Sequence, residues 1–397
     1  RGPGFLRAMF CVHRSASTRA AIPGLTSLRA PGSLEAMNSG DDTVRASNGE
    51  GASFRTPEEA GLRDAERLSR LMAAASAGDL EAQAELGACL VGGRGVEASP
   101  RRGVQWLRQA AGRGHARARY NLAICYAEGK GVPASETRAL GWLRKAAAQG
   151  VPEAQYEMAY RLLEGRGCAR DVFGAQRLLL EAARSGMPEA QFLLADTLLH
   201  GFGTGDDAVD TEQGLRWLRA AASAGYAPAE LELGVCFSKG RGVQQDPAEA
   251  VAWFRRAALK GMAQAQYNLA LCYDRGEGVA PDPEEAADWY RKAADAGLAQ
   301  AAYNLALSYD SGEGYALSPQ DAYLYLKRSA DLGHPAGAFQ LACLLLTGQE
   351  ALPADVPAAL RYLRVAAKAG HADARALLER LTQAGVGAAT VDGARER

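Results

Sequence analysis

Apolar residues recur along this chain at the spacing of a helix, in segments that end at glycines. In the stretch 262–297, Ala265, Leu269 and Tyr273 stand at i, i+4 and i+8, which places them on one helix face that must be covered. The Gly-Glu-Gly at 276–278 ends this helix, because glycine readily takes the positive φ values of a helix terminus. The first half of the stretch therefore predicts one amphipathic helix.

A second helix is predicted from Asp282, which can cap it, with Pro283 at the first helical position and Glu285 completing a capping box. Good N-cap residues fill the equivalent position of every copy, namely Ser99, Ser135, Asp171, Asp210, Asp246, Asp282, Ser318 and Asp355. Seven residues further on stands a large side chain in each copy, namely Trp106, Trp142, Leu178, Trp217, Trp253, Trp289, Tyr325 and Tyr362. In four copies an Ala pair follows four residues later. A large side chain followed by two alanines near the end of a helix predicts that neighbouring helices pack closely there.

This helical hairpin repeats at a nearly constant period. The glycine that closes each copy stands at Gly78, Gly114, Gly150, Gly186, Gly225, Gly261, Gly297, Gly333 and Gly370. The intervals are 36, 36, 36, 39, 36, 36, 36 and 37 residues. A period in this range is typical of a solenoid, in which each unit covers its apolar face only by stacking on its neighbours.

The pattern A-x-Y-N-L-A-x-x-Y-x-x-G-x-G-V, a capped turn and A-x-x-W-Y-x-K-A-A-x-x-G resembles the Sel1-like repeat, a relative of the tetratricopeptide repeat. The resemblance covers Gly78 to Gly370. It implies an all-α, right-handed α-solenoid of about eight helix-turn-helix repeats, used as an adaptor without chemistry of its own in most members. Similar proteins serve in complex assembly and in protein quality control such as endoplasmic-reticulum-associated degradation, and the repeat alone does not choose among them.

The composition outside the repeats predicts three parts of the chain. Residues 57–381 form the solenoid, with a half-repeat helix at each end as a cap. Residues 1–56 form a disordered leader, and residues 382–397 a polar tail. Residues 1–34 hold five Arg and no Asp, which is the composition of an organellar transit peptide or of an untranslated region read as protein. The expected localisation is cytoplasmic, with a mitochondrion or plastid as the alternative.

Charge and hydropathy limit the kinds of partner that the chain is expected to bind. The formal net charge of −1 gives no electrostatic case for nucleic acid, and no apolar run approaches the length of a membrane span. A soluble protein with a protein or peptide partner is therefore predicted.

No residue pattern predicts catalysis or a cofactor. Four cysteines (Cys89, Cys125, Cys236 and Cys272) share one position of successive repeats, too far apart for disulfides, so reduced thiols are expected. No C-x-x-C, H-E-x-x-H, G-x-S-x-G or P-loop motif occurs. We expect a protein that is not an enzyme. The alternative is a hydrolase or ligand binder, because some bacterial relatives of this repeat are associated with β-lactams.

The first helices should line a concave face that binds the partner. We number positions in each repeat from the closing glycine before it, so that Asn268 occupies position 7. Position 7 is polar in seven of eight copies: Glu85, Asn121, Glu157, Glu232, Asn268, Asn304 and Gln340, with Leu193 as the exception. In tetratricopeptide modules a similar Asn binds the backbone of an extended peptide, since an amide supplies donor and acceptor. We therefore predict that the three Asn grip a partner segment and that the glutamates favour basic partners. The alternative is that these residues only form a solvated face.

Overall fold

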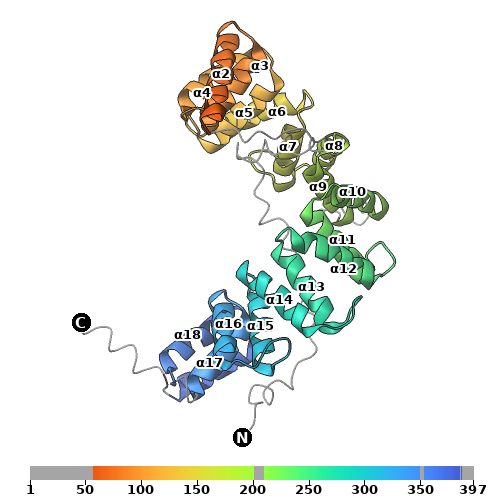
Figure 1. The fold of residues 1–397 in the computed structure, drawn as a ribbon, viewed down its shortest axis with the longest axis vertical. Helices are drawn as coiled ribbons and strands as arrows, with labels where there is room; N and C mark the ends of the chain where they lie inside the picture. Colours follow the sequence, from red (N-terminus) through yellow and green to blue (C-terminus); the bar gives the residue numbers. More distant parts are fainter. Residues whose placement is uncertain (1–56, 201–209, 349–352, 385, 387–397) are drawn as a thin grey trace, which may run out of the picture. The chain divides into compact units, whose positions relative to one another are not determined.

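A computed structural model describes residues 57–200, 210–348, 353–384 and 386, with backbone alone at 57–65. Within these ranges the chain forms 18 helices and no strand. From α3 to α18 the helices come in pairs, one pair for each predicted repeat (Figure 1). The prediction of an all-α chain of eight two-helix repeats is confirmed. The predicted leader 1–56 lies outside the described residues.

The chain divides into two compact units, with the boundary between Ala224 and Gly225. The described helices of the first unit are α2 (Pro57–Ser76), α3 (Leu80–Gly92), α4 (Pro100–Gly112), α5 (Ala116–Glu128), α6 (Glu136–Ala147), α7 (Pro152–Glu164), α8 (Val172–Arg184), α9 (Pro188–His200) and α10 (Thr211–Ser223). Those of the second unit are α11 (Ala227–Lys239), α12 (Pro247–Leu259), α13 (Ala263–Arg275), α14 (Pro283–Asp295), α15 (Ala299–Ser311), α16 (Pro319–Asp331), α17 (Pro335–Thr347), α18 (Val356–Lys368) and α19 (Ala372–Gln383).

Inside each unit every helix packs against the next one in chain order. Helix α2 packs on α3, and α19 packs on α18, so these two helices stand where the half-repeat caps were expected. Helix α19 continues two residues past the predicted end of the solenoid at 381.

The turns within each repeat follow from glycines and N-cap residues. All nine closing glycines have positive φ, between 81° and 101°. All eight predicted caps stand at helix N-termini, but Ser99 and Ser135 make no side-chain cap bond. The capping box expected at Glu285 is not what holds this turn, because the Asp282 N–H instead donates to the Tyr273 carbonyl at 3.0 Å. The same backbone bond, 2.8–3.1 Å long, joins the two helices of every repeat.

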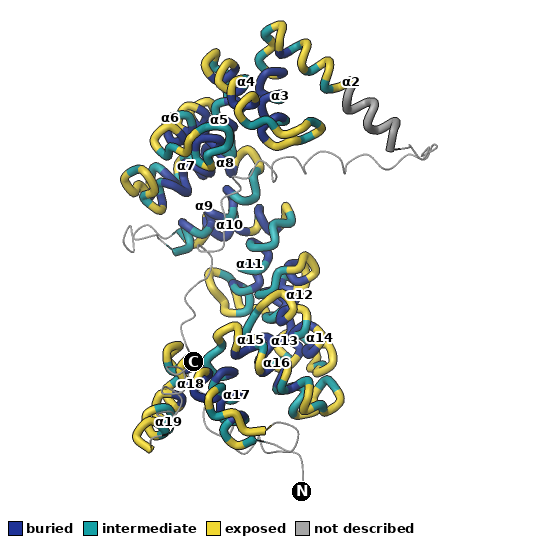
Figure 2. The backbone as a smooth tube through the Cα atoms, turned by 90° about the vertical axis from the view of Figure 1, so that its left-hand side faces the viewer, coloured by how far each residue is buried: buried dark blue, intermediate teal, exposed yellow. Residues whose placement is uncertain are grey.

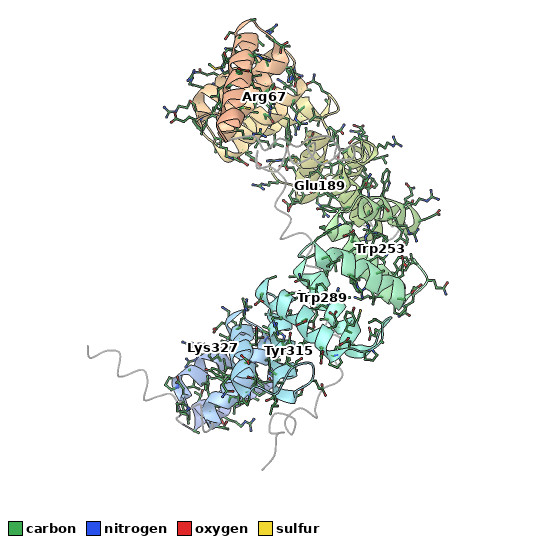
Figure 3. All side chains as sticks on the ribbon, in the orientation of Figure 1. Arg67, Glu189, Trp253, Trp289, Tyr315 and Lys327 are labelled. Carbon is green, nitrogen blue, oxygen red and sulfur yellow. The ribbon has the colours of Figure 1, made fainter. Side chains whose placement is uncertain are left out.

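The core lies where the helices meet (Figure 2). The alanine pairs are buried as predicted, with Ala293 and Ala294 fully covered. In most repeats the large buried side chain is not the predicted one but the next residue in the sequence. Most of the predicted large side chains are only half-buried, among them Trp253, which Figure 3 labels on α12. The residue after each is at most 3% exposed: Leu107, Leu143, Leu179, Leu218, Phe254, Tyr290, Leu326 and Leu363.

Three of the tryptophans lie against a cation of the same helix. The Lys292 Nζ lies 3.7 Å from the ring centroid of Trp289. The same i, i+3 contact is formed by Lys145 over Trp142 and by Arg256 over Trp253, both at 4.5 Å. These cation–π contacts shield the exposed side of each ring.

Glutamine side chains at position 5 join successive repeats. The Gln266 Nε2 donates to the Ala258 carbonyl at 3.2 Å, which belongs to the last turn of the helix before it. Equivalent bonds are donated by Gln83, Gln155 and Gln191 to Ala75, Ala147 and Ala183. Each bond adds a second donor to a carbonyl of the last helical turn, which also accepts from the N–H of the closing glycine.

Repeat 5 departs from this pattern, because position 5 holds Glu230. Its side chain is fully buried and accepts from Arg256 Nε at 3.1 Å and from Lys260 Nζ at 2.7 Å. A buried carboxylate needs such partners, since an unpaired buried charge is strongly destabilising.

Candidate functional site

The structure shows how accessible the predicted position-7 side chains are. Asn121, Glu157 and Leu193 are buried, with exposed fractions of 6%, 8% and 2%. Glu85, Glu232, Asn268, Asn304 and Gln340 are half-buried. The amides that a partner can reach therefore lie on α13, α15 and α17 of the second unit, while little of the Asn121 amide is open to one. Binding of a partner at Asn121 stays a prediction.

Each position-7 glutamate is already paired with an arginine of the same chain. Glu85 pairs with Arg67 at 2.9 Å and Glu232 with Arg241 at 3.0 Å. Glu157 accepts from Arg161 Nε at 3.0 Å. Because an internal cation balances each charge, a basic partner would have to compete with it. The prediction that these glutamates favour basic partners stays untested.

The amides of α15 and α17 contact tyrosines of the preceding repeat. The Gln340 Nε2 donates to the Tyr303 hydroxyl at 2.8 Å. The Asn304 side chain lies beside the hydroxyls of Tyr267 and Tyr290 and lowers the pKa of both, against the larger effect of burial. Burial raises the pKa of Tyr303 to about 12, so its hydroxyl stays protonated at neutral pH. The repeat pattern does not reveal these contacts, although the Tyr267–Asn304 and Tyr303–Gln340 pairs both span 37 residues.

These contacts leave part of the hydrogen-bonding capacity of the amides unused. An amide carries two N–H donors and an oxygen with two acceptor sites. The Asn268 Oδ1 accepts from Gln264 Nε2 at 3.2 Å, and in the described part of the chain its nitrogen donates no bond. Gln340 uses one N–H toward Tyr303. The face formed by Asn268, Asn304 and Gln340, which we call the amide face, can therefore bind further donors and acceptors.

The side chains that flank each amide at positions 3 and 10 of its own helix are uncharged. Positions 3 and 10 of the same three helices hold Gln264 and Leu271 on α13, Gln300 and Leu307 on α15, and Ala336 and Cys343 on α17. No charged residue stands at positions 3, 7 or 10 of these helices. Such a surface suits the backbone of an extended peptide, which is polar but uncharged.

The described cysteines are free thiols, as expected. Burial raises the pKa of Cys125 to about 12 and that of Cys272 to about 11. Among the residues that the structure covers, no three His, Cys, Asp or Glu side chains are grouped so that they could hold a metal ion. In the same residues no helix is both long enough and apolar enough to cross a bilayer.

Comparisons with known proteins agree with the repeat architecture. The family model described as "Sel1 repeat" matches residues 80–115, 116–151, 152–187, 188–226, 227–262, 263–298, 299–334 and 335–371. A comparison with curated proteins gives no match.

Two solved structures resemble the chain over most of its length. One is c5321, a protective antigen of uropathogenic Escherichia coli strains with an SLR fold. It is 29% identical with a TM-score of 0.69, over 79% of this chain and 67% of that one. The other is a Sel1 repeat protein from Oxalobacter formigenes, 27% identical with a TM-score of 0.63, over 88% of this chain and 99% of that one.

Proposed function

Since the chain belongs to the Sel1 repeat family, we propose that it is a non-catalytic scaffold that binds an extended segment of a partner protein on the amide face. Repeat arrays of this type present extended surfaces built from equivalent positions of successive units. An extended peptide fits such a surface, because its backbone groups also recur at a regular spacing. The adaptor serves in assembling or sorting other proteins.

One observation carries this proposal. Amide side chains stand at position 7 of three consecutive repeats, half-buried, with donors and acceptors to spare. Half-burial favours binding, because a side chain held by its neighbours loses little conformational entropy when a partner arrives. The tyrosine contacts of Asn304 and Gln340 provide this restraint.

The position-7 glutamates of the first unit do not offer the same surface. Glu85 and Glu157 are each bound to an arginine of the chain. A partner would gain little there, since an existing ion pair would first have to break. We therefore assign the partner segment to α13, α15 and α17.

Site-specific photo-crosslinking in a lysate of the source cells tests this assignment. A photoreactive residue replaces Leu271, at position 10 of α13, in one protein and Leu324 in another. Leu324 lies on the second helix α16 and is 57% exposed. A defined partner should crosslink through position 271 and not through position 324. Crosslinking from position 324 alone would place the binding surface elsewhere.

A second arm measures the affinity of the crosslinked segment as a synthetic peptide. The Asn268→Ala, Asn304→Ala double variant should bind about five- to 150-fold more weakly, since two lost hydrogen bonds contribute about 1–3 kcal/mol together. The matched control is Tyr303→Phe, which removes the Gln340 contact but keeps every amide. It should lose only the affinity that the restraint of Gln340 contributes, and therefore less than the double variant. Unchanged binding by the double variant would contradict the proposal.

A further inference from the structure

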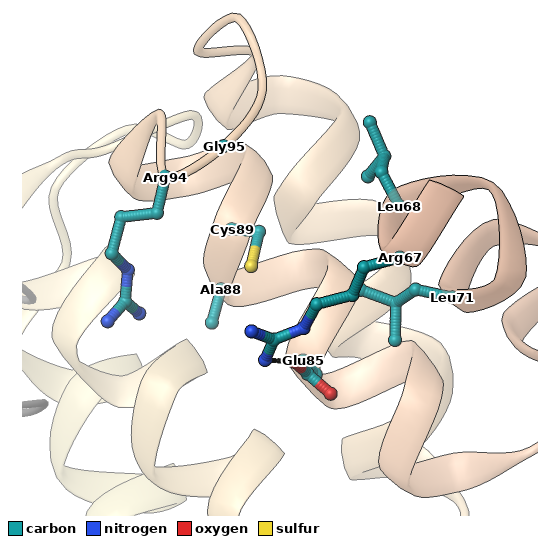
Figure 4. A pocket seen from close by; sticks show the side chains of 8 residues that line it. All are labelled: Arg67, Leu68, Leu71, Glu85, Ala88, Cys89, Arg94 and Gly95. Atoms are coloured by element: carbon teal, nitrogen blue, oxygen red, sulfur yellow. Dashed lines mark hydrogen bonds and ion pairs between the residues drawn. The ribbon is translucent and has the colours of Figure 1, made fainter. Parts of the chain in front are cut away.

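A cavity of about 270 Å³ lies where α2 packs on α3 (Figure 4). Leu68 and Leu71 of α2 and Ala88 of α3 provide its apolar lining. Its polar groups are Arg67, Glu85 and Arg94, the last from the loop that follows α3. This cavity belongs to the first unit and shares no residue with the amide face.

Arg94 lacks the partner that its counterpart has elsewhere in the chain. Arg94 occupies position 16 of repeat 1, and Arg241 occupies position 16 of repeat 5. Arg241 pairs with the position-7 carboxylate of its own repeat, Glu232, at 3.0 Å. In repeat 1 the position-7 carboxylate, Glu85, accepts instead from Arg67 of the capping helix α2 at 2.9 Å.

Because Glu85 pairs with Arg67, the guanidinium of Arg94 has no carboxylate partner in its own repeat. Arg94 forms no ion pair within the described residues, and its Nε is buried without a hydrogen-bond acceptor. A buried donor without an acceptor is destabilising, and a bound acceptor would remove this cost. Because Arg67 of the capping helix α2 pairs with Glu85, Arg94 keeps a buried donor that an anion can use.

Charge and size define what fits there. The charges of Arg67, Arg94 and Glu85 sum to +1, so one monoanion neutralises the cavity. Burial raises the pKa of the Cys89 thiol, against the effect of Arg94 and Arg67, so Cys89 adds a neutral wall. The volume lies just below the roughly 300 Å³ at which sites for drug-sized ligands begin. One amino-acid-sized group fills it.

We propose that this cavity binds a carboxylate attached to a compact branched apolar group. The Arg94 guanidinium holds the carboxylate, because its planar fork matches two carboxylate oxygens. The apolar group lies against Leu68, Leu71 and Ala88. A ligand of this chemistry can be the C-terminal residue of a partner chain or a free small acid. This site is independent of the amide face.

Fluorescence anisotropy on the full chain distinguishes the two sources. The probes are a fluorescein-labelled Gly-Ser-Gly-Leu peptide with a free carboxylate, and the same peptide as its amide. The carboxylate peptide should bind at least about tenfold more tightly than the amide. Competition by 4-methylpentanoate then shows whether a free acid suffices. Equal binding of both peptides, or no binding of either, would overturn the proposal.

The variants locate the site. Arg94→Gln should weaken binding of the carboxylate peptide at least about tenfold, whereas Arg94→Lys should keep part of it. Arg241→Gln is the matched control, because it removes the arginine at the same position of repeat 5, and it should leave the affinity unchanged. Thermal melting confirms that each variant is folded. Equal losses for Arg94→Gln and Arg241→Gln would refute the assignment. The Asn268→Ala, Asn304→Ala double variant should bind this peptide normally, so that failure of one proposal is distinguishable from failure of the other.

Discussion

The contact between neighbouring repeats at Gly278 gives the sharpest test of how the array is held together. Gly278 lies in the loop of repeat 6 with φ 76°. A Cβ at this position would overlap the Pro247 carbonyl group and lie 2.7 Å from the Ala248 nitrogen, both in the first turn of α12 in repeat 5. Gly131 and Gly314 approach Pro100 and Pro283 in the same way. The loop of one repeat therefore rests directly on the backbone of the repeat before it.

We predict that Gly278→Ala lowers the free energy of unfolding by about 2–5 kcal/mol. A left-handed conformation costs an L-residue about 1–2 kcal/mol. The overlap with the backbone adds about 1–3 kcal/mol, the usual cost of overpacking. Gly297→Ala is the matched control. Gly297 has φ 91°, but a Cβ there meets nothing within 4 Å, so only the conformational cost applies.

Urea unfolding followed by circular dichroism measures both variants. Because stability in repeat arrays includes nearest-neighbour interface terms, Gly278→Ala should also broaden the transition, as repeats 5 and 6 uncouple. Equal losses of stability in the two variants would show that the loop does not press on its neighbour. The account of inter-repeat packing would then be wrong.

Three further predictions follow from other contacts. Burial lowers the pKa of His334 to about 4, and its Nδ1 accepts from the Gly337 N–H at 3.2 Å to cap α17. The unfolded chain therefore binds this proton more readily, so the stability from His334 is complete above pH ~6.5 and falls toward pH 4 by about 2 kcal/mol after solvent screening. His334→Ser, which keeps a cap without a titrating group, should lose less in pH-dependent melts, and an equal loss would contradict the assignment. Glu230→Ala should cost about 1–3 kcal/mol in urea unfolding, because Arg256 and Lys260 lose their shared carboxylate but are nearly half-exposed and regain water, and a loss below about 0.5 kcal/mol would show that this pair contributes little. Purified protein should not turn over nitrocefin, and turnover that follows the protein through purification would favour a hydrolase.

The sequence was sufficient for the repeat frame because its signals are local. Closing glycines, N-cap residues and apolar spacing each depend on a few neighbouring residues, and all of them recur. The predicted caps illustrate the limit of such signals. Asp282 caps α14 with its side chain, whereas Ser99 stands at the right place without forming the bond. The residue type fixes what a side chain can do, but its rotamer depends on the surroundings.

Burial was harder to predict, because it depends on how neighbouring helices rotate. The repeat period correctly predicts that a large side chain faces the next helix. In the first repeat, however, the buried side chain is that of Leu107 and not that of Trp106. The same uncertainty affects the candidate site. Asn121 and Asn268 occupy the same position of their repeats, yet Asn121 is buried and Asn268 is half-buried. No pattern in a single repeat distinguishes them.

Ion pairs between residues far apart in the sequence also could not be predicted from the repeat pattern. Glu85 and Glu232 are equivalent in sequence, but Arg67 of a helix outside the repeats takes the first of them. That exchange depends on the register of α2 against α3, which a repeat consensus does not contain. The unpaired Arg94 is its consequence.

The central claim is that a partner segment binds across the amide face, and one affinity measurement tests it most directly. Isothermal titration calorimetry with the crosslinked segment compares the wild-type chain with the Asn268→Ala, Asn304→Ala double variant. Thermal melting first establishes that the two proteins are equally stable. The account predicts that the double variant binds about five- to 150-fold more weakly, with a smaller loss for Tyr303→Phe. An unchanged Kd for the double variant would contradict it.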